Sequence, residues 1–300
     1  MSNSIPEIED ADLLFIFGYN GADSHPIVAR RIVRAKEKGA TLITVDPRVT
    51  ETARISDMHL PIKGGTNMIL VNAFGNVLIN ENLYDEEFIK EHTDNFEEYK
   101  KIVEPYTPEY AAKYTNIPAD MIRKTMREYA KAKDAMILYG MGVCQFSQAV
   151  DVVKGLASLA LLTGNFGRPN VGIGPVRGQN NVQGACDMGA LPDCYPGYQK
   201  VTNPEIRAKF EKAWGVKLPS KVGLKLTEVP HAVLEEHKIK AYYIFGEDPV
   251  QSDPDAAEVR EALDECEFVV VQDIFMNKTG LHADVIFPAT SWGEHDGVYS

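Results

Sequence analysis

The chain has 300 residues, of which 44% are apolar, 25% charged and 9% aromatic, which is the composition of a globular protein with room for two domains. Its net charge of −12 argues against sequence-independent binding of nucleic acid. It also means that nearby cations and backbone amides must hold any anionic ligand. No run approaches the roughly 20 apolar residues of a membrane span, and the N-terminus lacks the basic start and apolar core of an export signal, so we expect a cytoplasmic chain without a membrane span.

The first 46 residues predict the beginning of a parallel α/β fold. The apolar run Leu13–Phe17 is typical of a strand buried on both faces, and it ends at Gly18. A helix is expected from Pro26 to just before Gly39, and a second strand over residues 41–45. This order is the first half of a dinucleotide-binding fold. The usual GxGxxG sequence is absent, so a conventional nicotinamide site is not expected.

The pattern continues with further alternating elements up to the middle of the chain. A third strand is expected over residues 58–62, before Gly64 and Gly65, and a fourth over residues 135–139, before Gly140. Helices are predicted at residues 67–80, 85–91, 96–103, from Pro118 onward, and at about 148–162.

The stretch from Gly174 to Ala190 stands out because it is too polar for a core strand and too rich in glycine for a helix interior. It follows a strongly apolar helix and contains a single cation, Arg177. Two interpretations stay open on composition alone. The stretch is either a loop whose backbone approaches a ligand closely, or a long structural loop that satisfies its own amides.

After Pro192 the sequence is loop-rich over residues 193–204 and 215–230, with a helix between them at about 204–214. The N-terminal pattern then returns, with a strand ending at Gly246, a helix near residues 255–265 and further strands at residues 268–271 and 285–288.

The spacing of this second pattern matches that of the first. Gly18 precedes Asp46 by 28 residues, and Gly246 precedes Asp273 by 27. A further aspartate follows 11 residues later in each case. We interpret this as two copies of one structural unit. The predicted fold is therefore α/β, with two Rossmann-like parallel-sheet domains over residues 1–178 and 179–300, helical insertions in the first, and only part of the second.

In such a fold the ligand lies beyond the carboxyl ends of the strands. Carboxylates at those ends suit the hydroxyls of a ribose or the N1–H and amino group of guanine, whereas an arginine and backbone amides suit pyrophosphate oxygens. For each aspartate taken singly, a cap or turn role is an equally good interpretation, and their repeated placement favours ligand binding. The candidates at these positions are Gly18, Asn20, Asp23, Ser24, Asp46, Pro47, Arg48, Gly140, Met141, Gly142, Gln145, Gly246, Glu247, Asp248, Gln272 and Asp273.

The chain shows no self-sufficient catalytic motif. Its four cysteines, at positions 144, 186, 194 and 266, form no CxxC pair and predict free thiols in a reducing compartment. Its seven histidines are scattered without ligand spacing, so no residue of this chain is expected to hold a metal. No GxSxG, HExxH or P-loop is present.

Several segments together resemble molybdenum- or tungsten-dependent formate dehydrogenase catalytic subunits, and the resemblance covers the whole chain. The most specific is Val176–Gly189, read as VRGQNNVQGACDMG. Segments 17–20, 23–26, 44–48, 140–143, 163–165, 246–249, 272–276 and 291–294 agree as well.

That family belongs to the bis-molybdopterin guanine dinucleotide oxidoreductases, in which two α/β domains hold two pterin dinucleotides. The resemblance implies that Arg177 lies beside the metal and orients formate, since a guanidinium fork suits a planar carboxylate. It assigns one nucleotide to Asp23, Asp46 and Arg48, and the other to the second copy. Further cofactor contacts are expected from Phe17, Gly65, Gly178, Gln179, Asn181, Ser252 and Ser291.

Some parts of the family pattern are not found in this sequence. The family's N-terminal iron–sulfur domain with its 4Fe–4S cluster, the selenocysteine or cysteine that ligates the metal, and the C-terminal domain do not match any segment here. We therefore expect an interior fragment that is inactive alone, and we hypothesise that its reading frame was taken to begin after a selenocysteine codon.

The resemblance also implies electron-transfer partners, and it leaves two alternative functions open. The complete enzyme would oxidise formate to carbon dioxide and pass electrons to an iron–sulfur or flavin subunit, linked to ferredoxin, to the deazaflavin coenzyme F420 or to a hydrogenase. Two alternatives stay open: a sister molybdopterin enzyme of the nitrate reductase or formylmethanofuran dehydrogenase type, and a non-catalytic nucleotide-binding subunit.

Overall fold

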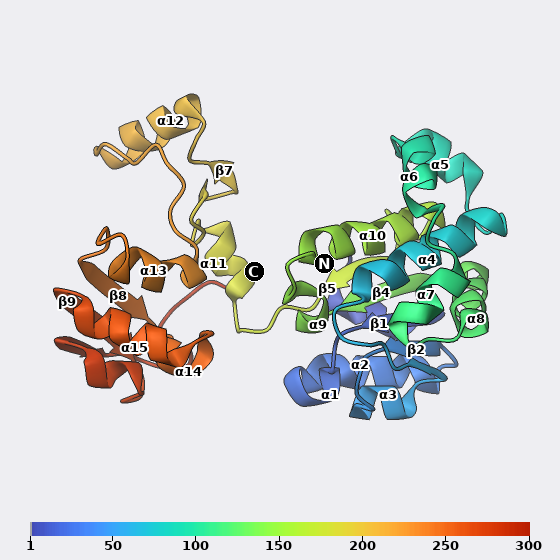
Figure 1. Ribbon diagram of the computed structural model, residues 1–300, viewed down its shortest axis with the longest axis horizontal. Coiled ribbons are helices and arrows are strands. Elements are labelled where there is room, and N and C mark those ends of the chain that lie inside the picture. The colour runs from blue at the N-terminus through green and yellow to red at the C-terminus, as the bar shows by residue number, and fades with distance from the viewer. Residues whose placement is uncertain (1) are drawn as a thin grey trace. The chain divides into compact units, whose positions relative to one another are not determined.

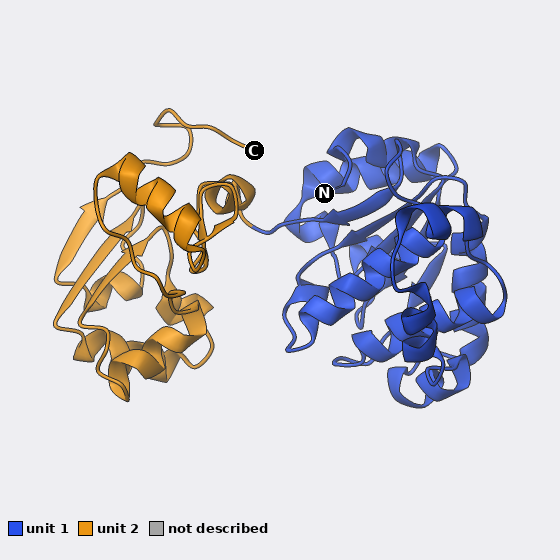
Figure 2. Ribbon diagram, turned by 90° about the horizontal axis from the view of Figure 1, so that it is seen from above, with its two compact units in different colours: residues 1–178 blue, residues 179–300 orange. Residues whose placement is uncertain are grey.

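The computed structural model describes residues 2–300, which divide into two compact units, one ending at Gly178 and the other beginning at Gln179 (Figure 2). Both units are α/β, with parallel sheets and many helices (Figure 1). No helix in the described part of the chain is both long and apolar enough to cross a membrane.

The first unit is built on a five-stranded parallel sheet in the order β3-β2-β1-β4-β5. The direction of winding reverses between β1 and β4, which lie side by side in the middle of the sheet. The strands are β1 (Leu13–Phe17), β2 (Thr41–Val45), β3 (Met58–Leu60), β4 (Ala135–Tyr139) and β5 (Gly172–Pro175).

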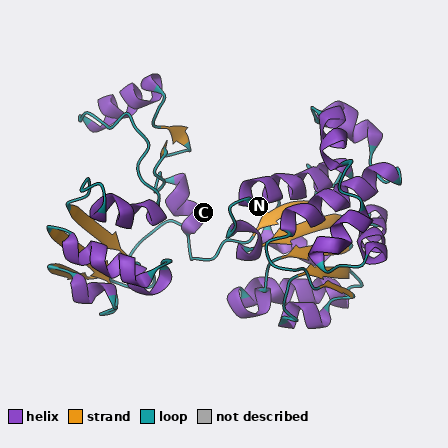
Figure 3. Ribbon diagram, viewed as in Figure 1, coloured by secondary structure: helices purple, strands orange, loops and turns teal. Residues whose placement is uncertain are grey.

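Helices cover both faces of this sheet (Figure 3), which is why its central strands are continuous apolar runs. Side chains of β1 alternate between two cores: Phe15 packs into the larger one with α4 and α8, and Ile16 into the smaller one with α2. The helices of the unit are α1 (Gly21–Ser24), α2 (Pro26–Glu37), α3 (Glu51–Ile55), α4 (Asn67–Asn80), α5 (Glu86–His92), α6 (Phe96–Val103), α7 (Pro108–Thr115), α8 (Ala119–Lys131), α9 (Met141–Cys144) and α10 (Ala149–Leu162), preceded by the 3₁₀ turn η1 (Ile5–Asp10).

The second unit contains a three-stranded parallel sheet in the order β10-β9-β8 and a short antiparallel pair, β6 and β7. Its strands are β6 (Cys194–Tyr195), β7 (Gln199–Lys200), β8 (Ala241–Phe245), β9 (Phe268–Asp273) and β10 (Val285–Pro288). Its helices are α11 (Val182–Asp187), α12 (Pro204–Trp214), α13 (Val229–Leu234), α14 (Pro249–Ser252) and α15 (Ala256–Glu265), with 3₁₀ turns η2 (Leu226–Glu228) and η3 (Thr279–His282).

Only one face of the second sheet is packed. Ile244, Val269 and Val271 meet α14 and α15 in a small core. On the opposite face the side chains of Tyr243 and Phe245 stay exposed, the latter by 70%.

The two units repeat the same local contacts, which bears out the predicted duplication. In the first, Asp57 accepts a hydrogen bond from the Leu42 amide at 2.9 Å; in the second, Asp284 accepts one from the Val269 amide at 2.7 Å. Gly18 and Gly246 both adopt positive φ, at 56° and 66°. Each glycine donates its amide to the neighbouring strand, at 2.8 and 2.9 Å respectively.

The polar stretch from Gly174 to Ala190 is not one continuous loop as predicted. It begins inside β5 and contains the short helix α11. A helix forms there despite the glycines for two reasons. Asn181, the residue before its first turn, adopts left-handed backbone angles, and Gly184 leaves room for the Asn181 side chain. A Cβ on Gly184 would lie 2.4 Å from Asn181 Oδ1.

Candidate functional site

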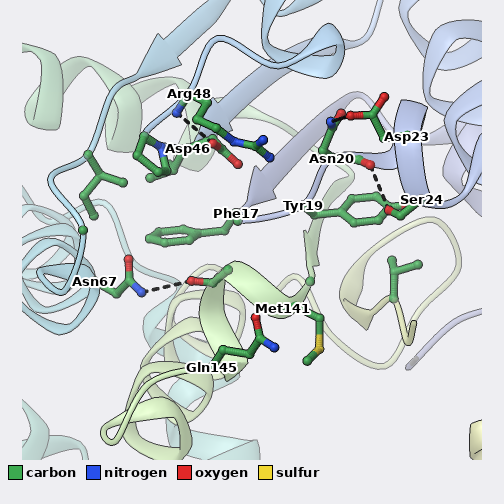
Figure 4. Close-up of a pocket in the computed structure, with 18 of the residues that line it drawn as sticks. Phe17, Tyr19, Asn20, Asp23, Ser24, Asp46, Arg48, Asn67, Met141 and Gln145 are labelled. Atoms are coloured by element: carbon green, nitrogen blue, oxygen red, sulfur yellow. Dashed lines mark hydrogen bonds between the residues drawn. The ribbon is translucent and has the colours of Figure 1, made fainter. Parts of the chain in front are cut away.

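A pocket of about 470 Å³ lies at the carboxyl edge of the first sheet, where the winding direction reverses (Figure 4). This is the position at which open α/β sheets bind their ligands, and the volume is typical of a small-molecule site. The pocket is lined by Phe17, Gly18, Tyr19, Asn20, Asp23, Ser24, His25, Val45, Asp46, Pro47, Arg48, Ile62, Gly64, Asn67, Gly140, Met141, Gly142, Gln145, Phe146, Val176 and Gly178.

Three glycines let the loops after β1 and β4 touch at the base of this pocket. A Cβ on Gly18 would lie 2.7 Å from the Gly142 carbonyl carbon, and a Cβ on Gly142 would lie 2.7 Å from the Gly18 Cα. The Gly142 amide donates to the Gly18 carbonyl at 3.0 Å. A Cβ on Gly140 would meet the Gly18 oxygen at 3.0 Å. These glycines therefore serve backbone packing between the two loops.

Asp46 and Arg48 form the part of the wall that follows β2. The Asp46 side chain is buried, and its Oδ1 accepts the Arg48 amide at 2.9 Å (Figure 4). The Asp46 carbonyl contacts His59 Nε2 at 2.9 Å. The same turn that holds the carboxylate therefore also places Arg48 on the pocket.

The loop after β1 supplies a second polar group. Asn20 Nδ2 donates to the Asp23 carboxylate, and Ser24 Oγ donates to the Asn20 carbonyl at 2.8 Å. Thr52 of α3 donates to Asn20 Oδ1 at 3.3 Å, which ties this loop to the next helix. Acceptors and donors thus alternate along one side of the pocket.

Helix α4 contributes a residue that sequence reasoning missed. Asn67 Nδ2 donates to the Gly142 carbonyl at 3.2 Å, so it holds the loop after β4 in place (Figure 4). Other lining residues outside the predicted set are Tyr19, His25, Val45, Ile62, Gly64, Phe146 and Val176. Proximity to a predicted strand end was a usable signal for Tyr19 and Gly64, whereas Asn67 needed the position of α4.

Arg177 follows β5 and belongs to the first unit, but it is not among the pocket-lining residues. Cys144 is exposed as a residue, but partial desolvation of its thiol raises the pKa, and the Arg177 guanidinium works against that rise. Burial likewise raises the pKa of Tyr139, with the nearby Cys144 adding to the rise and Arg177 opposing it. The Arg177 charge therefore lies close to the ends of β4 and α9.

Of the remaining predicted residues, two lie at or next to the pocket and two belong to the second unit. Gly178 lines the pocket, and Gly65 lies next to the lining residue Gly64 with φ of 84°. Gln179 and Asn181 belong to the second unit, where Asn181 Nδ2 donates to the Val298 carbonyl at 2.8 Å.

The predicted residues of the second unit lie at the carboxyl ends of its strands. Gly246, Glu247 and Asp248 follow β8, while Gln272 and Asp273 end β9. The contacts here repeat those of the first unit: Ser252 Oγ donates to the Asp248 carbonyl at 3.1 Å, and Asp273 Oδ1 accepts the Phe275 amide at 3.1 Å. Ser291 follows β10 and donates its amide to Glu294 at 2.8 Å.

Among residues 2–300, no three His, Cys, Asp or Glu side chains are grouped so that they could hold a metal ion. The four cysteines are free thiols, and Cys144 is the exposed one.

The sequence model of the molybdopterin oxidoreductase family matches residues 1–300. The chain belongs to this family.

Relatives of this molybdopterin oxidoreductase include formate dehydrogenase H of Escherichia coli K12, which is 57% identical over 301 residues, covering 100% of this chain and 42% of the relative. The F420-dependent formate dehydrogenase subunit alpha of Methanocaldococcus jannaschii is 50% identical over 301 residues, covering 100% of this chain and 44% of the relative. The chain thus spans less than half the length of these relatives.

Acetylene hydratase from Pelobacter acetylenicus has the same fold. It superposes with a TM-score of 0.75 over 97% of this chain and 44% of its own, at 22% identity.

Membership of the family implies a molybdopterin cofactor that carries molybdenum or tungsten. The pocket of the first unit fits the organic part of such a group. It combines apolar walls (Phe17, Val45 and Ile62) with the Asp46 carboxylate and the Arg48 cation at the end of a parallel sheet.

Proposed function

We propose that this chain is part of the catalytic subunit of a formate dehydrogenase, which oxidises formate to carbon dioxide. The observation that carries the proposal is the identity of 46–57% with four formate dehydrogenase subunits over the whole length of this chain. The C–H bond of formate breaks and releases carbon dioxide, one proton and two electrons. The metal–pterin group, when bound, accepts those two electrons.

The cofactor that we propose is the guanine dinucleotide form, bound once by each unit. In the first unit the Asp46 or Asp23 carboxylate would accept hydrogen bonds from the N1–H and amino group of guanine or from the ribose hydroxyls, and Arg48 would pair with pyrophosphate. In the second unit, Asp248 and Asp273 occupy the equivalent turns. The repeated hydrogen bonds of the two units support two sites of the same kind.

Arg177 is the residue of this chain that we assign to formate. Its guanidinium is planar and offers parallel donors, so it would bind both carboxylate oxygens and fix the direction of the C–H bond. It lies just after β5, beside the pocket that would hold the pterin dinucleotide of the first unit. The electrons would leave through an iron–sulfur cluster outside this chain to a partner subunit, as the F420-dependent relatives suggest.

The proposal is tested on the full-length protein purified from its native source. We expect formate-dependent reduction of a viologen dye, molybdenum or tungsten in the metal analysis, and release of a guanine nucleotide on acid denaturation. A metal-free protein would favour the non-catalytic alternative, and turnover of nitrate without turnover of formate would favour a sister enzyme.

In the same full-length protein, Arg177→Lys should raise the KM for formate and lower kcat, because lysine is a point charge without the bidentate fork. The expected loss of kcat/KM is about 10- to 100-fold, which corresponds to the roughly 1.5–3 kcal/mol of a charged hydrogen bond. Lys124→Arg, a charge-conserving change at an exposed residue of α8 outside the pocket lining, serves as the control. Unchanged kinetics of Arg177→Lys would remove Arg177 from the substrate site.

A further inference from the structure

A histidine between α1 and α2 contacts the chain segment that carries Arg177. His25 Nε2 lies 2.5 Å from the Arg177 carbonyl oxygen, although 152 positions separate the two residues in the sequence. His25 Nδ1 lies 2.9 Å from Ser24 Oγ. The ring therefore connects the loop after β1 with the main chain after β5.

The chemistry of the partners fixes the direction of the first bond. A carbonyl oxygen only accepts, so Nε2 must carry a hydrogen and donate it to Arg177. In the imidazolium form Nδ1 donates to Ser24 Oγ, which leaves the Ser24 hydroxyl hydrogen for the Asn20 carbonyl. In the neutral form Nδ1 accepts, and the single Ser24 hydroxyl hydrogen goes either to Nδ1 or to that carbonyl. The Nε2–H donor is present in both forms, so the bond to Arg177 does not depend on the charge of the ring.

The ring is held in this orientation by packing. His25 lies against Tyr19 with ring centroids 5.5 Å apart and a tilt of 49°, and the Tyr19 side chain is itself buried. Beyond Nδ1, the hydrogen bonds continue through Ser24 to the Asn20 carbonyl (Figure 4). Both sides of the ring are thus fixed to the wall of the pocket.

The segment that His25 contacts leaves the sheet after Val176. The Val176 amide donates to the Tyr139 carbonyl at 2.9 Å, so the chain is fixed to the sheet up to that point. A Cβ on Gly178 would meet no atom within 4 Å. The hydrogen bond from His25 therefore adds a restraint on the peptide between Arg177 and Gly178.

We infer that His25 is a positioning residue that fixes the peptide plane of Arg177, and with it the direction in which the Arg177 side chain leaves the chain, to the dinucleotide pocket of the first unit. The inference rests on the proposed function for the role of Arg177 in formate binding. The anchoring itself rests on the hydrogen bond alone.

The test compares two substitutions in the full-length, cofactor-loaded protein. His25→Phe keeps a ring to pack on Tyr19 but removes the donor, whereas His25→Gln keeps an N–H near the place of Nε2. His92→Phe is the matched control, because His92 is an exposed residue of α5 that lies outside the pocket. Hydrogen exchange of the peptide that contains Val176–Gly178 is measured by mass spectrometry, together with kcat and KM for formate.

We expect His25→Phe to speed amide exchange in that peptide and to raise the KM for formate about three- to tenfold, the equivalent of one hydrogen bond, with a smaller change in kcat. His25→Gln should restore both quantities most of the way, and His92→Phe should change neither. Equal effects of the Phe and Gln variants, or normal exchange in His25→Phe, would overturn the inference.

The two proposals fail in different ways. If His25→Phe speeds exchange but neither it nor Arg177→Lys alters the KM for formate, then the anchoring holds and the assignment of Arg177 to formate is wrong. If Arg177→Lys raises the KM and His25→Phe changes neither exchange nor KM, then the proposed function stands and the role of His25 is refuted.

Discussion

Glycines at the carboxyl edge of the first sheet differ in what surrounds them. Gly142 has the backbone of Gly18 where a side chain would begin, at 2.7 Å, whereas Gly178 faces open space. The sequence marks these residues equally as loop glycines. Only the structure separates a glycine that closes a backbone contact from one that leaves room beside the pocket.

This difference predicts the outcome of two identical substitutions. Gly142→Ala should lower the free energy of unfolding by about 1–3 kcal/mol, because backbone atoms cannot move aside as a flexible side chain does. Gly178→Ala should change it by no more than about 0.5 kcal/mol. Urea denaturation of both variants measures the difference, and equal values would show that the loops after β1 and β4 are not in tight contact.

Glu7 provides a test at acid pH. Hydrogen bonds from the Asn3 side chain, the Asn170 amide and Ser4 favour its carboxylate form, and they lower its pKa from 4.5 to about 2. A lowered pKa in the folded state stabilises the fold above pH 4.5, and this contribution is lost as the pH falls toward 2.

Wild type should therefore be more stable than Glu7→Gln at pH 7, and the gap should narrow steadily as the pH falls from 4.5 toward 2. Urea midpoints of the two proteins at a series of pH values give the gap directly. A gap that stays constant below pH 4.5 would mean that the carboxylate is not selectively stabilised in the folded protein.

At the scale of the elements, periodicity predicted most helices and strands well. β1, β2, β4, α4, α6 and α12 agree with the predicted ranges, because each is a run bounded by a glycine, a proline or a capping residue. β5 was missed because Gly172–Pro175 contains two glycines and a proline, and only its neighbour β4 makes it a strand. α11 was missed for a similar reason: its left-handed first residue and the fit around Gly184 depend on three-dimensional contacts.

The contact between α4 and α6 contains a defect that can be removed. The Tyr99 hydroxyl is buried without a hydrogen-bond partner, and it lies where a Cβ on Gly75 would come within 2.3 Å. Burial of this group also raises its pKa. An unsatisfied buried hydroxyl costs roughly 1–3 kcal/mol.

Tyr99→Phe should therefore leave stability unchanged or raise it by about 1 kcal/mol, since the variant loses only the unsatisfied group. Gly75→Ala should destabilise the wild type by more than it destabilises Tyr99→Phe, because the clash involves the hydroxyl. Thermal denaturation of the two single variants and the double variant checks this coupling. Additive effects would show that the hydroxyl does not occupy the space beside Gly75.

At the scale of the whole molecule, the repeated spacing predicted the duplication, and the boundary between Gly178 and Gln179 divides the structure into two compact units. The position of the pocket followed from the rule that ligands lie beyond the carboxyl ends of parallel strands. The apolar run of β1 predicted that the first sheet is covered on both faces. The sequence could not show that the second sheet is covered on only one face, because the residue types of β8 do not distinguish exposed from buried aromatic side chains.

The open face of the second sheet leads to a prediction for the described chain. Phe245 is 70% exposed and its neighbour Tyr243 is 58% exposed, so the pair forms an apolar surface in water. Phe245→Ser should reduce binding of a hydrophobic dye and raise solubility, with a change in unfolding free energy within about 0.5 kcal/mol. Ile244→Ser, one position away and buried, is the contrasting variant and should unfold the unit. A large loss of stability in Phe245→Ser would mean that this face is covered.

The matching turns of the two units also reveal where the copies have diverged. Arg48 stands two positions after Asp46, which follows β2, and Phe275 stands two positions after Asp273, which ends β9. Each of these amides donates to the carboxylate of its own aspartate. The two turns thus share their main-chain geometry and differ in the side chain, which is a cation in one and an aromatic ring in the other. Occupants of identical composition would consequently meet unequal surroundings in the two halves.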